Sequence, residues 1–273
     1  MSGFFKPADY LSKDPATVDE REAKRLRYDA KQRAKLCRAM VRVTARRGYA
    51  GASVHEALRV AGYGKSAYYR HFEDRESCLL EAFERSAATL LGRVGAAAGD
   101  GDGPATRVGV GLQAFVEMLG GAPDLARVML IEVRVAPRCR EAQQRWLGRF
   151  AELLEGCLSA DTSGADGEVA RLVAGALLER LASGVRKEGR GKLAEALPDL
   201  AFIALAPYAG TEGAMTEMGR YREQLSRRAP KPRVTPDPER SKAERSPREE
   251  LLARVETMSE EEAARARLII EEG

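Results

Sequence analysis

Residues 48–76 read GYAGASVHEALRVAGYGKSAYYRHFEDRE, and this stretch decides the fold. Ser53 is followed three residues later by Glu56, a capping box that predicts a short helix over residues 54–61. Gly62-Tyr63-Gly64 is a tight turn, and a second short helix is expected over residues 65–72. Two short helices joined by a glycine turn are typical of a unit that reads DNA.

The second helix carries the side chains that such a role requires. A helix in the major groove presents its N-terminal side chains to the base edges, and here these are Lys65, Ser66 and Ala67. The next turn holds residues that can reach phosphates, which fix position on the duplex: Tyr69, Arg70 and His71. The alternative is that the aromatic residues are ordinary core. We adopt that interpretation for Tyr68 and Phe72, whereas Tyr69 is expected to face phosphate.

A basic helix is expected before this pair, over residues 27–47. Leu36, Met40 and Val43 recur at offsets of four and three, and Gly48 ends the pattern. Residues 21–75 contain 15 lysines or arginines and five acidic residues, so they carry +10, and the remainder of this +4 chain carries −6. Such an asymmetry is typical of a phosphate-binding domain joined to a part that does not touch DNA. A solvated helix face with a chance excess of cations is the alternative.

The stretch resembles the signature of the TetR (tetracycline-repressor) family of transcriptional regulators. The matching runs are Gly48-Tyr49, Ser53-Val54, Ala61-Gly62, Tyr69-Arg70-His71-Phe72 and Asp74-Arg75-Glu76. The resemblance implies a homodimer with a three-helix DNA-binding domain and a divergent helical ligand-binding domain. It also implies that Ser53, Tyr69, His71 and Arg75 contact backbone phosphates, while Lys65, Ser66, Ala67 and Arg70 face bases.

Three positions depart from the family pattern. Gly64 stands where a serine usually caps the recognition helix, a loss of roughly a few tenths of a kcal/mol. Ala57-Leu58 inverts the usual large-then-small order, and Arg75 replaces a lysine while keeping the charge. The motif is still present with these changes, but the operator sequence cannot be predicted from it.

The whole chain is expected to be all-α, because Ala, Leu, Glu and Arg dominate and β-branched runs of strand length are missing. Asp74 is expected to cap a helix that runs to Ala98, and further helices are expected over residues 105–120, 124–135, 137–159, 167–187, 192–208 and 211–228. The expected organisation has five parts: a polar N-terminal arm (1–26), a three-helix helix-turn-helix DNA-binding domain (27–75), a larger antiparallel helical-bundle domain for ligand binding and dimerisation (76–228), a Pro-rich charged linker (229–245) and appended short helices (246–273).

The larger domain offers weaker signals. A set of large side chains is a candidate effector pocket, with ordinary core as the alternative: Phe115, Met118, Met129, Glu132, Trp146 and Phe150. Glu132 and Arg134 lie in an otherwise apolar segment and are candidates for a polar anchor, or else a salt-bridged or surface pair. Small residues in the segments 167–187 and 192–208 permit close helix approach, and the resemblance places a homodimer interface there.

Other expectations follow from what the sequence lacks. The four cysteines form no CxxC pair and fit unpaired core thiols, so no metal site and no cofactor are expected. The run Ala201–Ala209 is too short for a membrane span, and no signal peptide is visible, so a cytoplasmic protein is expected.

The leading hypothesis is a homodimeric ligand-responsive repressor that reads a palindromic operator and is released by a small-molecule effector. An activator, or an effector-independent protein with the same DNA-binding unit, is the alternative. An α-helical enzyme is more remote, because no phosphate loop, H-E-x-x-H or G-x-S-x-G motif is present. No catalytic residue is expected.

Overall fold

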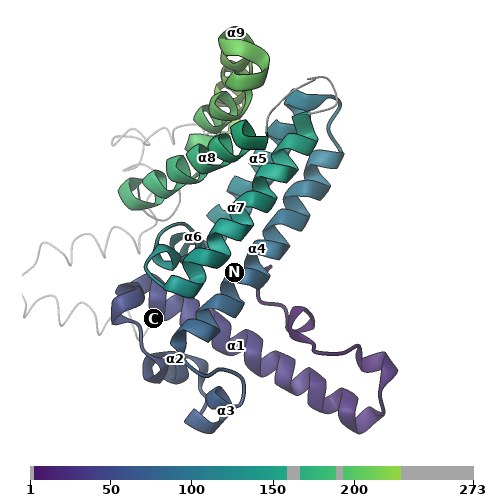
Figure 1. Cartoon of the computed structure of the whole chain (residues 1–273), viewed down its shortest axis with the longest axis vertical. Coiled ribbons are helices and arrows are strands. Elements are labelled where there is room, and N and C mark those ends of the chain that lie inside the picture. The colour runs from purple at the N-terminus through teal and green to yellow at the C-terminus, as the bar shows by residue number, and fades with distance from the viewer. Residues whose placement is uncertain (1–2, 159–166, 189–192, 229–273) are drawn as a thin grey trace, which may run out of the picture. The chain divides into compact units, whose positions relative to one another are not determined.

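A computed structural model of the chain describes residues 3–158, 167–188 and 193–228, and it contains helices and no strand within those ranges (Figure 1). The all-α prediction is therefore confirmed. The α-helices are α1 (Glu20–Gly51), α2 (Val54–Ala61), α3 (Lys65–Tyr69), α4 (Arg75–Gly99), α5 (Pro104–Gly120), α6 (Pro123–Leu130), α7 (Pro137–Leu158), α8 (Gly167–Glu188) and α9 (Leu197–Arg228). The expected linker and appended helices lie outside the described residues. Among the described helices, none has the length and apolarity that crossing a membrane requires.

The N-terminal segment differs from the polar arm that the sequence suggested. Two short 3-10 helices, Pro7–Tyr10 and Pro15–Thr17, precede α1, which begins seven residues earlier than expected because Asp19 accepts a hydrogen bond from the Glu22 amide. Three aromatic side chains of this segment are buried in the core: Phe4, Phe5 and Tyr10. The expected polar arm over residues 1–26 thus holds three apolar anchors among its scattered charges, and its last seven residues belong to α1.

The predicted recognition helix is shorter than expected. α2 has the expected bounds, and Gly62 adopts the left-handed conformation (φ 68°) that closes it. α3 begins at Lys65 as expected but ends at Tyr69, and the amides of His71 and Phe72 both donate to the Tyr68 carbonyl in a turn. α4 begins with the expected Asp74 cap, completed by Ser77 in a reciprocal capping box.

Three of the later segments differ in detail from the expected helices. The segment expected as one helix over residues 124–135 breaks at Ile131 (φ −122°, ψ −61°) into α6 and the 3-10 helix Glu132–Arg134. α9 changes direction at Gly210, whose φ of 70° is left-handed, so the segments expected on either side of that glycine are joined at a kink. The segment expected to begin at residue 192 opens instead with the 3-10 helix Leu193–Ala196.

One continuous apolar core joins these helices. α4 packs against α1, α5 and α7, and α5 also packs against α7, so α4, α5 and α7 lie side by side, as Figure 1 shows. All four cysteines are buried and unpaired, as expected. Because the described residues up to Arg227 form one compact unit, the division at residue 75 between a DNA-binding and a ligand-binding domain stays a prediction.

Candidate nucleic-acid interface

The leading end of α3 is presented to solvent. Lys65 and Ser66 are exposed and Ala67 is half-buried, while no side chain caps the helix at Gly64. Tyr69 is 57 % exposed. A helix whose first turn is uncovered can enter a groove without any rearrangement of the chain, as base reading requires.

Tyr68 holds α3 in this position from beneath. Its ring is fully buried and packs against the Phe72 ring at 5.4 Å, and its hydroxyl donates to the Asp74 carbonyl at 2.9 Å. Burial raises the pKa of the Tyr68 phenol well above its usual value, so the hydroxyl stays a donor. Tyr68 and Phe72 are core, as expected, and the α3 backbone is fixed by them.

Ser53 is the N-cap of α2. Its hydroxyl accepts a hydrogen bond from the Glu56 amide at 3.2 Å and so caps α2. The Glu56 carboxylate, which the capping box would direct back toward Ser53, pairs with Arg47 at 3.4 Å. Ser53 is nevertheless exposed, so its phosphate contact stays a prediction.

His71 is also engaged within the protein. Its Nε2 lies 2.8 Å from the amide oxygen of the buried Gln32, a pairing that places the ring proton on Nε2. Burial, followed by the nearby Arg33 cation, lowers the His71 pKa below its ordinary 6.5. The ring is therefore neutral at pH 7, and its proposed contact with phosphate would have to form beside the Gln32 bond.

Arg75 has a structural role that sequence reasoning missed. Its guanidinium donates to the Ala52 carbonyl at 2.8 Å and to the Ala50 carbonyl at 3.3 Å. It also lies over the Tyr49 ring, 4.5 Å from the centroid. Arg75 thus ties the first turn of α4 to the corner between α1 and α2. No local pattern signals this, because the two partners are backbone carbonyls more than twenty residues away.

Exposed cations lie on α3 and along α1. Arg70 is exposed and lies 3.9 Å from Asp29, a loose ion pair that leaves most of its donors to solvent. α1 contributes exposed cations along its length, namely Arg21, Lys24, Arg25, Arg27, Lys31, Lys35, Arg42, Arg46 and Arg47. A surface of this kind attracts polyanions and is expected to release counterions when it binds DNA.

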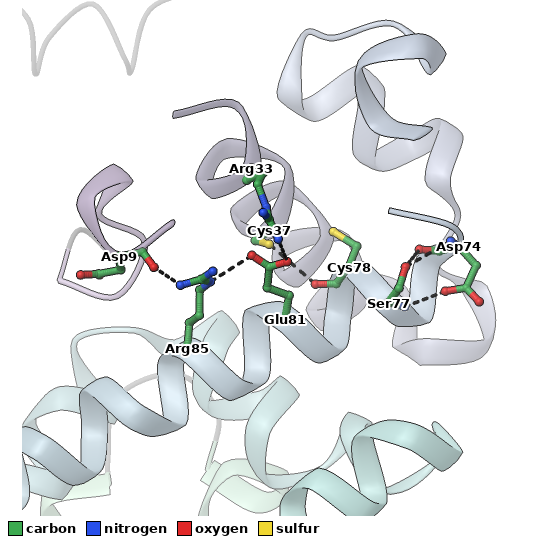
Figure 2. A network of polar contacts seen from close by, with 8 residues as sticks. All are labelled: Asp9, Arg33, Cys37, Asp74, Ser77, Cys78, Glu81 and Arg85. Atoms are coloured by element: carbon green, nitrogen blue, oxygen red, sulfur yellow. Dashed lines mark hydrogen bonds and ion pairs between the residues drawn. The ribbon is translucent and has the colours of Figure 1, made fainter. Parts of the chain in front are cut away.

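A polar network joins α1, α4 and the N-terminal segment (Figure 2). The Glu81 carboxylate on α4 pairs with both Arg33 on α1 and Arg85, the latter at 2.9 Å. Arg85 in turn donates to the Asp9 carbonyl, and its guanidinium lies 4.5 Å from the centre of the Tyr10 ring. The basic helix is therefore bonded to α4 through partly buried side chains.

The candidate effector residues are packed against one another. The Trp146 ring stacks on Phe115 at 6.2 Å and on Phe150 at 5.9 Å, and Met129 is fully buried while Met118 is half-buried. A cavity of about 140 Å³ borders Trp146. The Trp146 indole N–H has no hydrogen-bond partner among the described residues. The role of these residues as an effector pocket stays a prediction.

Glu132 does not point into that aromatic stack. Its Oε1 pairs with Arg127 at 3.1 Å, and its Oε2 accepts a hydrogen bond from the Tyr49 amide at 3.0 Å. Arg134 pairs with Glu179 of α8 at 2.7 Å. The turn after α6 is therefore bonded to both the end of α1 and α8, and Glu132 and Arg134 are each salt-bridged to another residue and not to one another. Their role as a polar anchor for an effector stays a prediction. Within the described residues, no group of His, Cys, Asp and Glu side chains could hold a metal ion.

Comparisons with known proteins bear on the fold. No family model and no curated protein sequence matches the chain. Among solved structures, the transcriptional regulator FadR from Bacillus subtilis, solved in complex with stearoyl-CoA, has a TM-score of 0.57 at 19 % identity over 64 % of this chain and 97 % of that one. The fatty acid degradation regulator FadR from Bacillus halodurans has a TM-score of 0.58 at 18 % identity, covering 67 % and 97 %.

TylP, a TetR regulator from Streptomyces fradiae, is similar over its full length. Its TM-score is 0.50 at 19 % identity, and the match covers 72 % of this chain and 99 % of TylP. The similarity at these identities concerns the fold. The chain has the all-α fold of these transcriptional regulators, one of them a TetR regulator.

Proposed function

We propose that the protein is a DNA-binding transcriptional regulator, and that it acts as a homodimeric repressor released by a small-molecule effector. The observation that carries the proposal is the uncovered first turn of α3, together with the exposed cations that α3 and α1 carry. Lys65, Ser66 and Ala67 would read base edges, and Tyr69 and Arg70 would contact the backbone. This function has no catalytic step and belongs in the cytoplasm, where the DNA is.

A dimer follows from the size of the recognition element. α3 has five residues and can contact few base pairs, so a second copy one helical turn away, about 34–36 Å, would be needed for a specific site. Two large apolar side chains are exposed on α8 and α9: Leu172, within the interface expected over residues 167–187 and 192–208, is 69 % exposed, and Met215, beyond the Gly210 kink, is 51 % exposed. Burying them against a second copy would remove apolar surface from water.

Ligand control is supported by two facts. The chain joins the basic N-terminal unit to a larger helical part over residues 76–228 whose 21 acidic and 19 basic residues nearly balance, and the similar FadR from Bacillus subtilis was solved with stearoyl-CoA bound. An effector that binds the state with low DNA affinity more tightly than the state with high DNA affinity, by about 1–3 kcal/mol, would change operator affinity about 5–150-fold.

Binding to DNA from the protein's own promoter region tests the proposal. Fluorescence anisotropy over a range of salt concentrations should show affinity that falls steeply with salt, because phosphate contacts release counterions. Lys65→Ala should change the preferred sequence, while Arg140→Gln, an exposed change on α7, should leave preference and affinity unaltered. Binding that is absent or insensitive to salt would refute a DNA-binding role.

A further inference from the structure

A cavity of about 250 Å³ lies where α1, α5, α6 and α8 meet. Its apolar wall includes Ala45, Leu119, Val185 and Leu193, one from each of α1, α5, α8 and the 3-10 helix before α9. The polar part of its lining holds two guanidinium groups, of Arg127 and Arg186, and one carboxylate, of Asp124. An apolar chamber with a few convergent polar groups is what small-molecule sites share.

Arg127 has N–H donors at this cavity that are not used by its ion pair with Glu132. One of its terminal nitrogens pairs with Glu132 at 3.1 Å, and its Nε is buried with no hydrogen-bond partner among the described residues. The side chain as a whole is 44 % exposed, so a molecule in the cavity can reach its terminal nitrogens, while the buried Nε becomes accessible only when the guanidinium shifts toward the cavity. A buried donor without a partner is rare in folded proteins and calls for an acceptor. Carboxylates fit that requirement, because they take two parallel N–H bonds from one guanidinium.

The residues behind Arg127 lead toward α2. Glu132, which holds Arg127 with one oxygen, accepts the Tyr49 amide at 3.0 Å with the other. The Tyr49 ring lies under the Arg75 guanidinium, which donates to the Ala52 carbonyl just before the α2 cap. An acceptor that draws Arg127 toward the cavity would weaken the hold of the cation on Glu132, and thereby the support of this corner.

We propose that this cavity is the effector site, that its ligand is a small organic monocarboxylate with an apolar body, and that Arg127 is the residue the carboxylate contacts. The proposal rests on the proposed function, since it names the ligand class and the site through which DNA binding is controlled. The ligand carboxylate takes the free donors of Arg127, and the apolar body fills the chamber. The bound state has a loosened Glu132–Tyr49 contact and a lower affinity for DNA.

Isothermal titration calorimetry of the full chain with hexanoate, octanoate and 4-phenylbutyrate tests the site, with octanamide as the neutral match for octanoate. At least one acid is expected to bind once per chain, and octanamide about tenfold or more weakly, because it lacks a charge-assisted bond. Arg127→Gln should weaken acid binding by a similar factor, whereas Arg140→Gln, on the exposed face of α7, should not change it.

A cavity-filling variant keeps the test decisive if Arg127→Gln does not fold. Gly120 lines the cavity, and a Cβ added there meets no atom within 4 Å, so Gly120→Leu should fold normally and fill part of the chamber. It should abolish acid binding while leaving the Arg127–Glu132 pair untouched. If none of the three acids binds the unmodified chain, or if the acid that binds does so equally in Gly120→Leu, the site is refuted.

Anisotropy with promoter DNA separates this proposal from the function on which it rests. The acid that binds should lower DNA affinity of the unmodified chain about 5–150-fold, and should have no effect on Gly120→Leu. Acid binding without any change in DNA affinity would refute an effector role for the cavity. Salt-sensitive DNA binding without acid binding would overturn only the site, whereas acid binding by a chain that never binds DNA would overturn the proposed function.

Discussion

The Glu132 carboxylate is bonded to the backbone amide of Tyr49 at 3.0 Å, across 83 residues of sequence. The amide belongs to the corner where α1 is interrupted, next to Gly48 with its left-handed φ of 72°. Because that corner precedes α2, one buried side chain of the larger helical part fixes where the helix-turn-helix begins. The 3-10 helix that carries Glu132 exists because the chain leaves the α-helical path at Ile131.

Glu132→Ala is expected to lower the free energy of unfolding by about 2–3 kcal/mol. The Tyr49 amide and the Arg127 guanidinium would both lose a partner, although the partial exposure of Arg127 limits its share. Urea denaturation followed by circular dichroism measures the change. Glu141→Ala, an exposed change on α7, should stay within about 0.5 kcal/mol, and equal losses in the two variants would contradict the role assigned to Glu132.

Two adjacent tyrosines should respond in opposite ways. Tyr68→Ala is expected to destabilise the protein by about 3–5 kcal/mol, because it empties a fully buried site and removes the bond to the Asp74 carbonyl. Tyr69→Ala should change stability little and lower DNA affinity for every sequence alike, since its side chain is 57 % exposed. Thermal unfolding and anisotropy on the same samples decide this. A Tyr69→Ala variant with normal DNA affinity would remove this residue from the interface.

Stability should fall below pH 6.5 because of His71. Its pKa is lowered in the folded state by burial and Arg33, so the unfolded chain binds more protons once the pH drops below the ordinary value of 6.5. The stabilisation is complete above that value and is lost as the pH falls through it toward the folded-state pKa. His71→Gln should flatten the curve of unfolding free energy against pH in this window. The chain has two histidines, so NMR can follow each ring, with His71→Gln assigning the signal. A His71 resonance that titrates at or above 6.5 would contradict the expected shift.

Gly109→Ala is expected to disturb the contact between α5 and α9. A Cβ at this position would lie 1.5 Å from the Tyr221 hydroxyl, so the ring must move, at a cost of about 1–3 kcal/mol. Gly148→Ala in α7, where a Cβ meets no atom within 4 Å, should instead stabilise by about 0.5–1 kcal/mol through helix propensity. Differential scanning calorimetry compares the two. The Tyr221 ring carbon that bears the hydroxyl would lie 2.7 Å from the same Cβ, so Tyr221→Ala, which removes both atoms, is the matched background. If Gly109→Ala costs as much stability in Tyr221→Ala as in the unmodified chain, the clash is not its cause.

Local sequence chemistry predicted the helix ends well. α2 has the expected bounds, α5 ends at Gly120, and α7 begins at Pro137. Each of these boundaries depends on a cap, a glycine or a proline within a few residues, and such signals act before any tertiary contact forms. The exposed first turn of α3 also followed from the sequence, because Lys65 and Ser66 interrupt the apolar pattern where a buried helix would continue it.

The sequence by itself thus determined an all-helical chain, most helix boundaries and the basic helix-turn-helix. Only the tertiary structure decided that the N-terminal aromatics are core, that Arg75 secures the α1–α2 corner, and that Glu132 joins this corner to the turn after α6. The physical reason is the distance along the sequence over which each kind of interaction acts. Caps and periodicity act over a few residues, whereas a side chain chooses between solvent, core and a distant backbone partner only when packing brings those partners together.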